Sequence, residues 1–497
     1  MHLSWKIRPN SYFDSIDLMR VAEQTRQLAG VTEVAVVMGT PTGRAMLAEA
    51  AMWPAEAPEG TPSDLLVAVR ASGEVVARHA LARVDDLLSA GRDAGPARAA
   101  PAPRTTASAA RGGAANVALV AVPGDYAVLD AHQALSSGLH VFLFSDGVSL
   151  DDEIALKRRA RERGLLVMGP ECGTAIINGV GLGFANRVRR GPIGIVGASG
   201  TGIQEVTSLV HRLGGGVSHA IGTGGRDLHG AVGGITTLQS LARLAADEST
   251  RALLIVSKPA SPAVADVVLR AAVEAKKPVV ACLLGYDGRV PGGVHAVTTL
   301  EEAAATAVSL AGGVVVELER SAPVTRGGAR GAVRGLYAGG TLCDEARRIV
   351  GGAPHGFVDF GAEEFTRGRP HPIIDPSRRN TAIVEAGDDP TVSVLLLDLI
   401  LGDCAHPDPS AAVAPALAEA RERARRGGRT LTVVAHVVVF DLPPGFPRAR
   451  AQTVHVAETS AGSWKSAPLL SVALASNTRK DSPAGAGCSM ILLIFEI

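Results

Sequence analysis

The sequence predicts an α/β fold with parallel sheets that helices cover on both faces. Short apolar runs recur along the chain, each has the length of one strand, and each ends in Gly, Pro, Asp or Ser. Segments with the spacing of amphipathic helices lie between these runs, as at residues 130–138 and 261–277. Strands that are apolar throughout are buried on both faces, and their alternation with helices is typical of parallel sheets.

The order of these elements predicts several units. Predicted strands lie at residues 31–39, 115–123, 139–145, 164–170, 191–197, 251–257, 277–285 and 392–400. Two stretches rich in Ala, Pro, Gly and Arg interrupt them at residues 94–115 and 321–335, and we interpret both as linkers or loops. We therefore predict an N-terminal α/β domain over 1–93, a linker over 94–113, α/β units over 114–190 and 191–315, and a third α/β domain over 333–437.

Composition narrows the class of protein. The 497 residues carry 49 Lys and Arg against 49 Asp and Glu, so no overall charge favours nucleic acid or a membrane surface. Aromatic residues make up only 3% of the chain, which disfavours stacking grooves for sugars or bases. The five cysteines form no Cys-x-x-Cys pair, so we expect neither a disulfide framework nor a bound metal. No apolar stretch is long enough to span a bilayer, and we expect a cytoplasmic protein.

Four loops join a strand to a helix through a turn rich in Gly, Ser or Thr. Ligands of open parallel sheets bind beyond the carboxyl ends of the strands, where the N–H groups that begin a helix bind anions. The strongest of the four is the loop 197–202, which precedes a clear amphipathic helix but lacks the Lys of a Walker A loop. We predict a phosphate-type site there, with a tight structural turn as the alternative.

The other three loops give weaker signals. Loops 39–44 and 122–126 are equally compatible with plain turns, and in loop 222–227 the cation Arg226 either binds an anion or pairs with Asp227. The predicted phosphate- or CoA-binding residues are Pro123, Gly124, Ser199, Gly200, Thr201, Gly202, Gly224, Gly225 and Arg226.

Two further clusters lie in the third α/β domain. Cys343 stands near the start of a predicted helix, where the helix dipole could lower the pKa of a thiol, although a small packing residue is the simpler interpretation. The loop 367–376 brings Arg367, Arg369 and His371 together between prolines. Two guanidiniums can bind a dicarboxylate or an acyl phosphate through paired hydrogen bonds, and an exposed cluster of ion pairs is the alternative.

Several of these motifs together resemble one family. Residues 115–188, 191–206 and 222–228 resemble the α subunit of succinyl-CoA synthetase. Residues 11–19, 36–47, 198–205, 335–346 and 368–380 match more closely the pattern of the FdrA family of acyl-CoA synthetase-like proteins. The resemblance extends over roughly residues 5 to 436. It implies a Rossmann-like CoA-binding unit over 114–190, a flavodoxin-like ligase unit over 191–315, and loops 122–126 and 169–172 beside the CoA.

The chain departs from this family pattern at one essential place. The synthetases carry a phosphoryl group on a histidine in a Gly-His-Ala-Gly-Ala loop, whereas the loop here reads Tyr286 to His295 without that motif. We interpret His295 as a structural or surface residue. The partner glutamate of the synthetase histidine falls near Lys258, so both members of the phosphoryl relay are missing, and Lys258 becomes a candidate catalytic residue together with Arg367, Arg369 and His371.

Three functions stay open at this point. The first is an acyl-CoA synthetase-like enzyme that binds CoA, phosphate or an acyl phosphate without the histidine relay. The resemblance also implies a subunit of an oxamate carbamoyltransferase in purine or allantoin breakdown, assembled with YlbE- and YlbF-like partners, in which phosphate attacks a carbamoyl group. The third is a non-catalytic subunit that binds CoA or a nucleotide.

The tail after residue 437 differs from the rest of the chain. The alternation of strands and helices stops, and residues 438–497 are rich in Pro, Ser and Ala without periodicity. We expect residues 441–497 to be poorly ordered, as after a change of reading frame or a truncation. The third α/β domain would then have an unpaired sheet edge.

Overall fold

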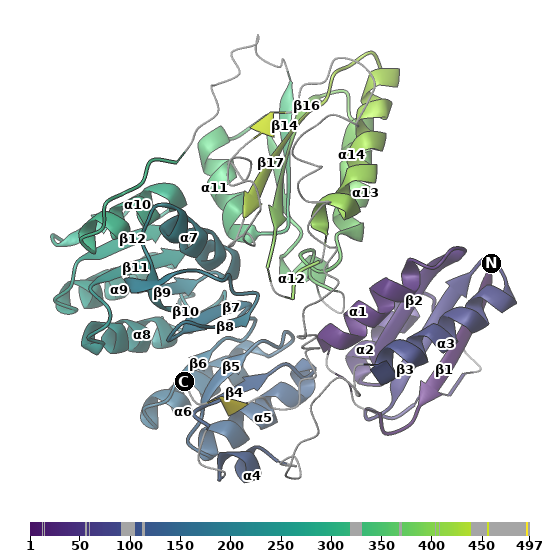
Figure 1. The fold of residues 1–497 in the computed structure, drawn as a ribbon, viewed down its shortest axis with the longest axis horizontal. Coiled ribbons are helices and arrows are strands. Elements are labelled where there is room, and N and C mark those ends of the chain that lie inside the picture. Colours follow the sequence, from purple (N-terminus) through teal and green to yellow (C-terminus); the bar gives the residue numbers. More distant parts are fainter. Residues whose placement is uncertain are drawn as a thin grey trace.

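The computed structural model describes residues 1–90 except 12, 14, 55, 56 and 59, residues 105–111 and 115–318, residues 331–438 except 367–369, 403 and 407, and the dipeptides 455–456 and 494–495. The described strands form four sheets, and each sheet is the centre of one lobe in Figure 1. The fold is α/β with mainly parallel sheets, as the sequence predicts.

The N-terminal domain is the exception, because its three-stranded sheet is antiparallel. Strand β3 (Leu65–Ala71) lies between β1 (His2–Arg8) and β2 (Val31–Met38). Helices α1 (Ser15–Arg26) and α3 (Glu74–Ala90) pack on one face, and α2 (Pro41–Glu49) follows β2. Strand β1 alternates polar and apolar residues, the pattern of a half-exposed antiparallel strand, and this signal was available in the sequence.

A small parallel sheet forms the next lobe, the four-stranded unit. Strands β4 (Val117–Val120), β5 (His140–Leu143) and β6 (Val167–Met168) are joined by α5 (Gly124–Ser136) and α6 (Leu150–Glu162). The short β19 (Ile494–Phe495) pairs with β4 antiparallel. Helix α4 (Thr106–Ala110) precedes this unit and has a capping box at Thr105, so part of the predicted linker 94–113 is helical.

The seven-stranded unit contains the main core. Its parallel strands are β9 (Arg190–Ala198), β10 (Val217–Gly222), β11 (Ala252–Ser257), β12 (Val279–Leu283) and β13 (Val294–Ala296), and the hairpin of β7 (Thr174–Ile177) and β8 (Val180–Gly183) extends the sheet beyond β10. Helices α7 (Gly200–Arg212) and α10 (Leu300–Leu310) contact each other, as do α8 (Ile235–Ala246) and α9 (Pro262–Glu274). The hairpin therefore belongs with this unit, whereas the sequence analysis placed the boundary after it, at residue 190.

The five-stranded unit corresponds to the predicted third α/β domain. Parallel strands β14 (Ala332–Tyr337), β15 (Gly356–Asp359), β16 (Val392–Ile400) and β17 (Thr432–Val438) alternate with helices α11 (Gly340–Val350), α12 (Glu363–Thr366), α13 (Ser377–Asp388) and α14 (Pro409–Arg426). The dipeptide β18 (His455–Val456) pairs with β17, so the edge expected to be unpaired has a partner over two residues. Apart from β18 and β19, the tail 441–497 lies outside the described residues.

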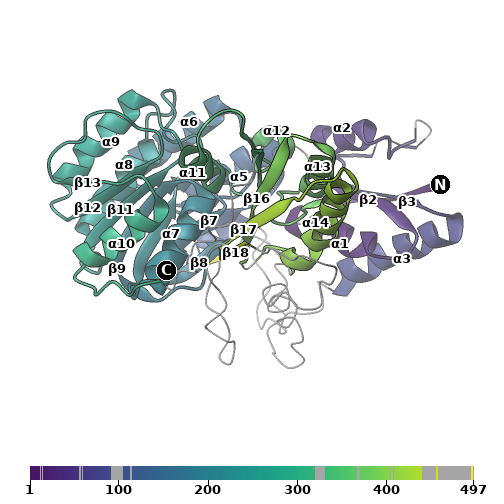
Figure 2. The same cartoon turned by 90° about the horizontal axis from the view of Figure 1, so that it is seen from above.

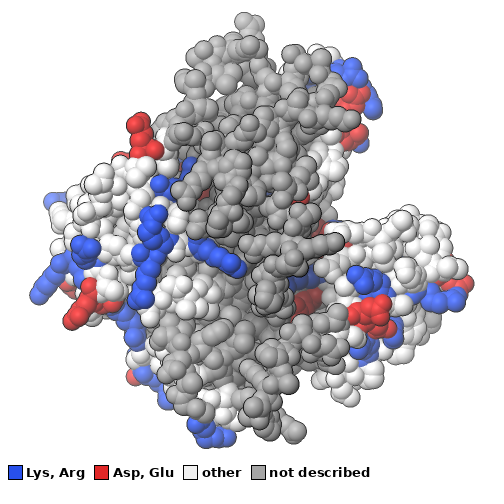
Figure 3. Space-filling model, in the orientation of Figure 1, with Lys and Arg blue, Asp and Glu red and all other residues white. Residues whose placement is uncertain are grey.

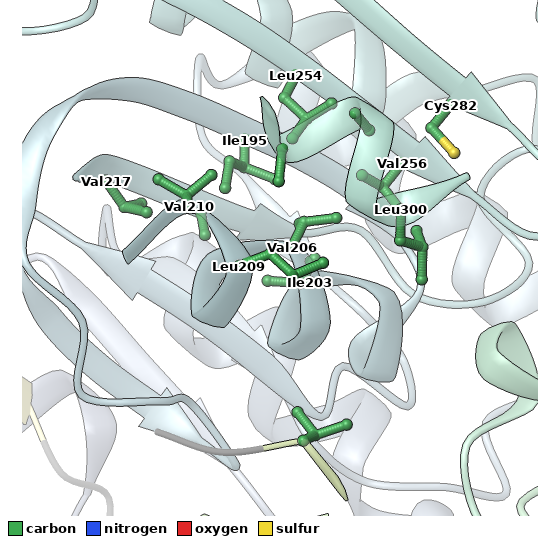
Figure 4. Packing of buried hydrophobic residues seen from close by; sticks show 14 of the residues in the cluster. Ile195, Ile203, Val206, Leu209, Val210, Val217, Leu254, Val256, Cys282 and Leu300 are labelled. Atoms are coloured by element: carbon green, nitrogen blue, oxygen red, sulfur yellow. The ribbon is translucent and has the colours of Figure 1, made fainter. Parts of the chain in front are cut away.

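Helix α7 shows how the core fixes the fold around the predicted phosphate loop. Ile203, Val206 and Leu209 lie on one face of this helix and pack against the sheet in Figure 4. Complete burial of one such side chain is worth about 1.5–3 kcal/mol. The start of α7 is thus held firmly at the carboxyl end of β9.

The lobes are joined by specific contacts between side chains. Figures 1 and 2 both show the N-terminal domain beside the five-stranded unit. Here the guanidinium of Arg26 on α1 lies 2.9 Å from the carboxylate of Asp375. Acidic and basic side chains of described residues both occur on the face shown in Figure 3. No helix in the described part of the chain has the length and hydropathy of a membrane span.

Candidate functional site

The first half of the site is the N-terminus of α7, in the loop that gave the strongest sequence signal. Ser199 caps the helix, because its hydroxyl accepts the N–H of Gly202 at 2.9 Å. The buried hydroxyl of Thr174 has no hydrogen-bond partner. Gly200 lies beside it: if Gly200 carried a side chain, its Cβ would be 3.7 Å from the Thr174 hydroxyl oxygen. An unpartnered buried hydroxyl beside a helix N-terminus has unused donor capacity that an anion can take up.

The second half comes from the five-stranded unit, where α11 also begins at glycines. Its residue Thr341 is fully buried, and the hydroxyls of Thr341 and Ser199 are hydrogen-bonded to each other. A Cβ on Gly339 would lie 3.1 Å from the side chain of Thr201. The N-termini of α7 and α11 therefore face each other, and their dipoles act on the same small volume.

Three ionisable side chains border these helix termini. The ammonium of Lys258, just after β11, lies 3.0 Å from the carboxylate of Asp359, at the end of β15. A Cβ on Gly340 would lie 2.0 Å from that ammonium, and one on Gly361 would lie 2.8 Å from Nε2 of His371. Lys258, Asp359 and His371 therefore gather near the start of α11. We define the α7–α11 site as these three residues together with Thr174, Ser199, Gly200, Thr201, Gly340 and Thr341.

The protonation state of His371 follows from its surroundings. Burial is the main cause that lowers the pKa of His371 to about 4; the charges of Lys258 and Arg379 act in the same direction, and that of Asp359 opposes them. Its Nδ1 accepts the N–H of Ile373 at 3.3 Å. The ring is therefore neutral at pH 7 and carries its proton on Nε2, which makes it a hydrogen-bond donor to the α7–α11 site.

The structure brings some predicted residues together and separates others. Lys258 lies beside Gly340 and His371 beside Gly361, and the predicted loop 199–202 reaches the same helix start through Gly339 and Thr341. Arg367 and Arg369 lie outside the described residues. The remaining predicted residues, Pro123, Gly124, Gly224, Gly225 and Arg226, belong to a second group of loops beside the four-stranded unit.

In this second group of loops, Gly124 and Gly224 each lie so close to the backbone of another loop that no larger residue fits. A Cβ on Gly124 would lie 2.3 Å from the carbonyl of Asp146, and one on Gly224 would lie 2.5 Å from that of Pro170. Gly225 has no such neighbour within 4 Å. Helix α5 begins after Pro123 without a side-chain cap, so its first N–H groups can bind an anionic group.

Arg226 does not pair with Asp227, which was the alternative interpretation. Its Nε lies 2.9 Å from Glu153, and its Nη2 donates to the carbonyl of Val148 at 2.8 Å. Asp227 instead pairs with the fully buried Lys157 at 2.7 Å, and Lys157 also binds Glu153 at 2.7 Å. This network fixes loop 222–227 on α6. The sequence contains one sign of it, because Glu153 and Lys157 are four residues apart on a helix and can form an ion pair.

Two other sequence interpretations can be compared with the structure. Burial raises the pKa of Cys343 to about 12, so the possibility of a thiol activated by the helix dipole is wrong and the packing interpretation holds. His295 is exposed on the edge strand β13, which agrees with its interpretation as a surface residue. Among the described residues, no group of His, Cys, Asp and Glu could hold a metal ion.

Family models match three parts of the chain. Three family models match the chain: "AllF, heavy metal-associated domain" over residues 1–103, "CoA binding domain" over 188–284, and "CoA-ligase" over 336–448. The α7–α11 site thus lies where the parts of the chain with the CoA-binding and CoA-ligase matches meet. The chain is an acyl-CoA synthetase-like protein of the CoA-ligase superfamily. The CoA-binding match falls on the unit that the sequence analysis assigned to a ligase.

The chain belongs to the same family as "Uncharacterized protein YahF" of Escherichia coli K12. The two are 38% identical over 477 residues, which cover 88% of this chain and 91% of YahF. The α 1 subunit of an ADP-forming succinate–CoA ligase from Archaeoglobus fulgidus is 30% identical over 148 residues, or 29% of this chain and 50% of that subunit. A dinucleotide-forming acetyl-CoA synthetase 1 from Ca. Korarchaeum cryptofilum aligns with a TM-score of 0.34 and 15% identity over 65% of this chain and 74% of that one.

Proposed function

We propose that this chain is an FdrA-type acyl-CoA synthetase-like enzyme that holds a phosphate or acyl phosphate directly in the α7–α11 site, without a phosphohistidine. The observation that carries the proposal is the position of Lys258 beside two facing helix N-termini. Each helix terminus favours a nearby anion by about 0.3–1 kcal/mol, and more where it is partly buried. A lysine ammonium adds a full positive charge at the same place.

The donors of the site suit a phosphoryl group. The Lys258 side chain is 37% exposed, so its ammonium can reach a ligand while its ion pair with Asp359 rearranges. The free hydroxyl of Thr174 and the Nε2–H of His371 add two neutral donors. Donors fixed in advance around a developing negative charge stabilise acyl transfer without a covalent carrier.

CoA fits the second group of loops. The uncapped N-terminus of α5 and the open space at Gly225 would hold its anionic end. When bound, CoA supplies a thiol as acyl acceptor. The residues of this chain orient the acyl phosphate, and Lys258 stabilises the phosphate that leaves when the bond from the acyl carbon to the phosphate oxygen breaks.

A matched pair of lysine variants tests this proposal. Lys258→Met should weaken the binding of inorganic phosphate and acetyl phosphate at least tenfold in calorimetry, and Lys258→Arg should retain part of it. Lys6→Met is the control, because Lys6 also pairs with an aspartate, at 2.6 Å from Asp85, but in the N-terminal domain. Equal phosphate affinity in Lys258→Met and Lys6→Met would refute the site.

A carbamoyl transferase is the second candidate. A lysine and neutral donors around a bound phosphate also suit attack of that phosphate on a carbamoyl carbon, which forms a P–O–C bond and breaks the C–N bond of oxalurate to release oxamate. Incubation with YlbE- and YlbF-like partners, oxalurate and phosphate would distinguish the two, because only this function yields carbamoyl phosphate. Ligand binding without turnover in either assay would identify a non-catalytic subunit.

A further inference from the structure

The N-terminal domain matches a model named for heavy metals, yet its own residues do not suit a metal. The first cysteine of the chain is Cys172, so residues 1–103 contain none. Heavy metals prefer soft thiolate ligands, which this domain cannot supply. The described residues also contain no group of His, Cys, Asp and Glu that could hold an ion. The domain must therefore contribute something else to the protein.

One end of this domain forms a wall of a cavity. A cavity of about 340 Å³ lies between the N-terminal domain and the start of α5. The N-terminal domain contributes Met38 at the end of β2 and the turn residues Pro62 and Ser63. The four-stranded unit contributes Val122, Pro123, Tyr126 and Asp130. The cavity thus needs both units, and it includes the loop predicted from sequence to flank CoA.

The wall from the N-terminal domain is rigid. The buried Asp64 accepts the N–H of Thr61 at 2.7 Å and that of Asn10 at 2.9 Å, so the turn with Pro62 and Ser63 at its tip is fixed on both sides. The carbonyl of Asp64 accepts the N–H of Gly39 at 2.7 Å, which joins the turn to the end of β2. The ion pair of Arg26 with Asp375 joins the domain to the five-stranded unit.

The lining determines what the cavity can bind. Met38, Pro62, Val122 and Pro123 are apolar, and the described residues that line the cavity include no Lys or Arg, so this lining favours a neutral group. The carboxyl of Asp130 and the hydroxyl of Ser63 are acceptors for N–H groups. Burial raises the pKa of Asp130, which reflects the apolar surroundings. A neutral group with an apolar body and an N–H donor matches this lining.

We infer that this cavity binds the neutral, amide-bearing part of an organic ligand, with the N-terminal domain as one wall of the site in place of a metal centre. Two ligands share this chemistry. One is the pantetheine arm of CoA, and this source rests on the proposed function. The other is a separate carboxamide substrate, which does not.

Two variants and their matched controls test the inference on the full chain. Ser63→Trp fills the cavity from an exposed turn, and Asp130→Leu removes the acceptor at similar volume. Ser89→Trp and Asp86→Leu, both at exposed positions of α3, are the controls. Binding of CoA, pantetheine and butyramide is measured by calorimetry and by saturation-transfer NMR.

The expected result is at least tenfold weaker binding in both cavity variants and unchanged binding in both controls. If the cavity variants weaken the binding of CoA and pantetheine, the ligand of the cavity is the pantetheine arm. If they weaken only the binding of butyramide, the ligand is a separate carboxamide. If no probe depends on Ser63 and Asp130, the inference is wrong. Inorganic phosphate, measured in parallel on Lys258→Met, reports on the proposed function alone, since no cavity residue belongs to the α7–α11 site.

Discussion

The guanidinium of Arg379 lies 2.8 Å from the carboxylate of Asp398, and both side chains are buried. The same carboxylate accepts the N–H of Ala338 at 2.7 Å and the N–H of Gly339 at 2.6 Å. These two residues form the turn before α11. The ion pair therefore fixes the position of one of the two helix termini in the α7–α11 site, although neither charged residue needs to touch a ligand.

Removal of Arg379 should release this turn. In Arg379→Met the carboxylate of Asp398 stays buried without its cation, and loss of one partner of a buried pair costs about 3–5 kcal/mol. We expect faster hydrogen exchange in residues 331–366 and a lower urea midpoint. The additional change Asp398→Asn should recover part of the loss, because the neutral amide needs no counter-ion.

Arg334→Met provides the comparison within the same unit. Arg334 pairs with Asp389 at 2.9 Å, but both side chains are about one third exposed. Such pairs are worth about 1 kcal/mol or less. If the two arginine variants lose equal stability, the pair of Arg379 and Asp398 does not have the special role described here.

Gly200 offers a test of the space at the start of α7. A Cβ there would make only ordinary contacts, at 3.7 Å from the Thr174 hydroxyl and 3.8 Å from Gly173, so Gly200→Ala should fold normally. The added methyl would occupy space beside the free hydroxyl and weaken phosphate binding at least tenfold in calorimetry. Gly73→Ala, which has no neighbour within 4 Å and lies in the N-terminal domain, is the control with unchanged phosphate binding. Full phosphate affinity in Gly200→Ala would place the anion elsewhere.

The buried thiols should be inert in the native protein. Burial raises the pKa values of Cys172, Cys282 and Cys343 to about 12. At pH 8 the reactive thiolate is then a very small fraction of each. Iodoacetamide labelling followed by mass spectrometry should modify these three only after denaturation. Rapid labelling of Cys343 in the folded chain would restore the interpretation of an activated cysteine.

The extent to which the sequence predicts this structure depends on how local each signal is. The strand-length apolar runs predict β4, β9, β11, β12 and β16 because continuous burial leaves a local pattern. The loop 199–202 was recognisable from its glycines and hydroxyl residues between a strand and a helix, whereas Lys258 became a candidate only through the family resemblance. The facing arrangement of Ser199 and Thr341 was not, since these residues are 142 positions apart and meet only when two units pack.

Other site residues show the same limit. Asp359 ends a short strand, which gives a weak local signal, and its role depends on Lys258, 101 residues away. Thr174 is notable only because its hydroxyl lacks a partner, a property that no sequence pattern shows. Cys343 was ambiguous because a helix start lowers the pKa of a thiol while burial raises it, and burial depends on tertiary packing.

His436 makes the stability of the site depend on pH. Its Nε2 on β17 lies 3.2 Å from the carboxylate of Glu205 on α7, so the pair joins the seven-stranded and five-stranded units. Burial lowers the pKa of His436, but Glu205, together with Glu345 and Asp398, outweighs this effect and raises the pKa to about 9. A histidine with a raised pKa stabilises the fold fully below the unfolded pKa of about 6.5, and this contribution is lost as pH rises toward 9.

We therefore expect the free energy of unfolding to fall between pH 6.5 and 9 by on the order of 3 kcal/mol, since each pKa unit corresponds to about 1.4 kcal/mol. Urea titrations at a series of pH values measure this slope. His436→Gln should abolish most of it, whereas His295→Gln, on the exposed edge strand, should leave it unchanged. Because α7 also forms half of the α7–α11 site, phosphate affinity should weaken over the same pH range in the unmodified chain but not in His436→Gln. A slope that persists in His436→Gln would assign the pH dependence to another group.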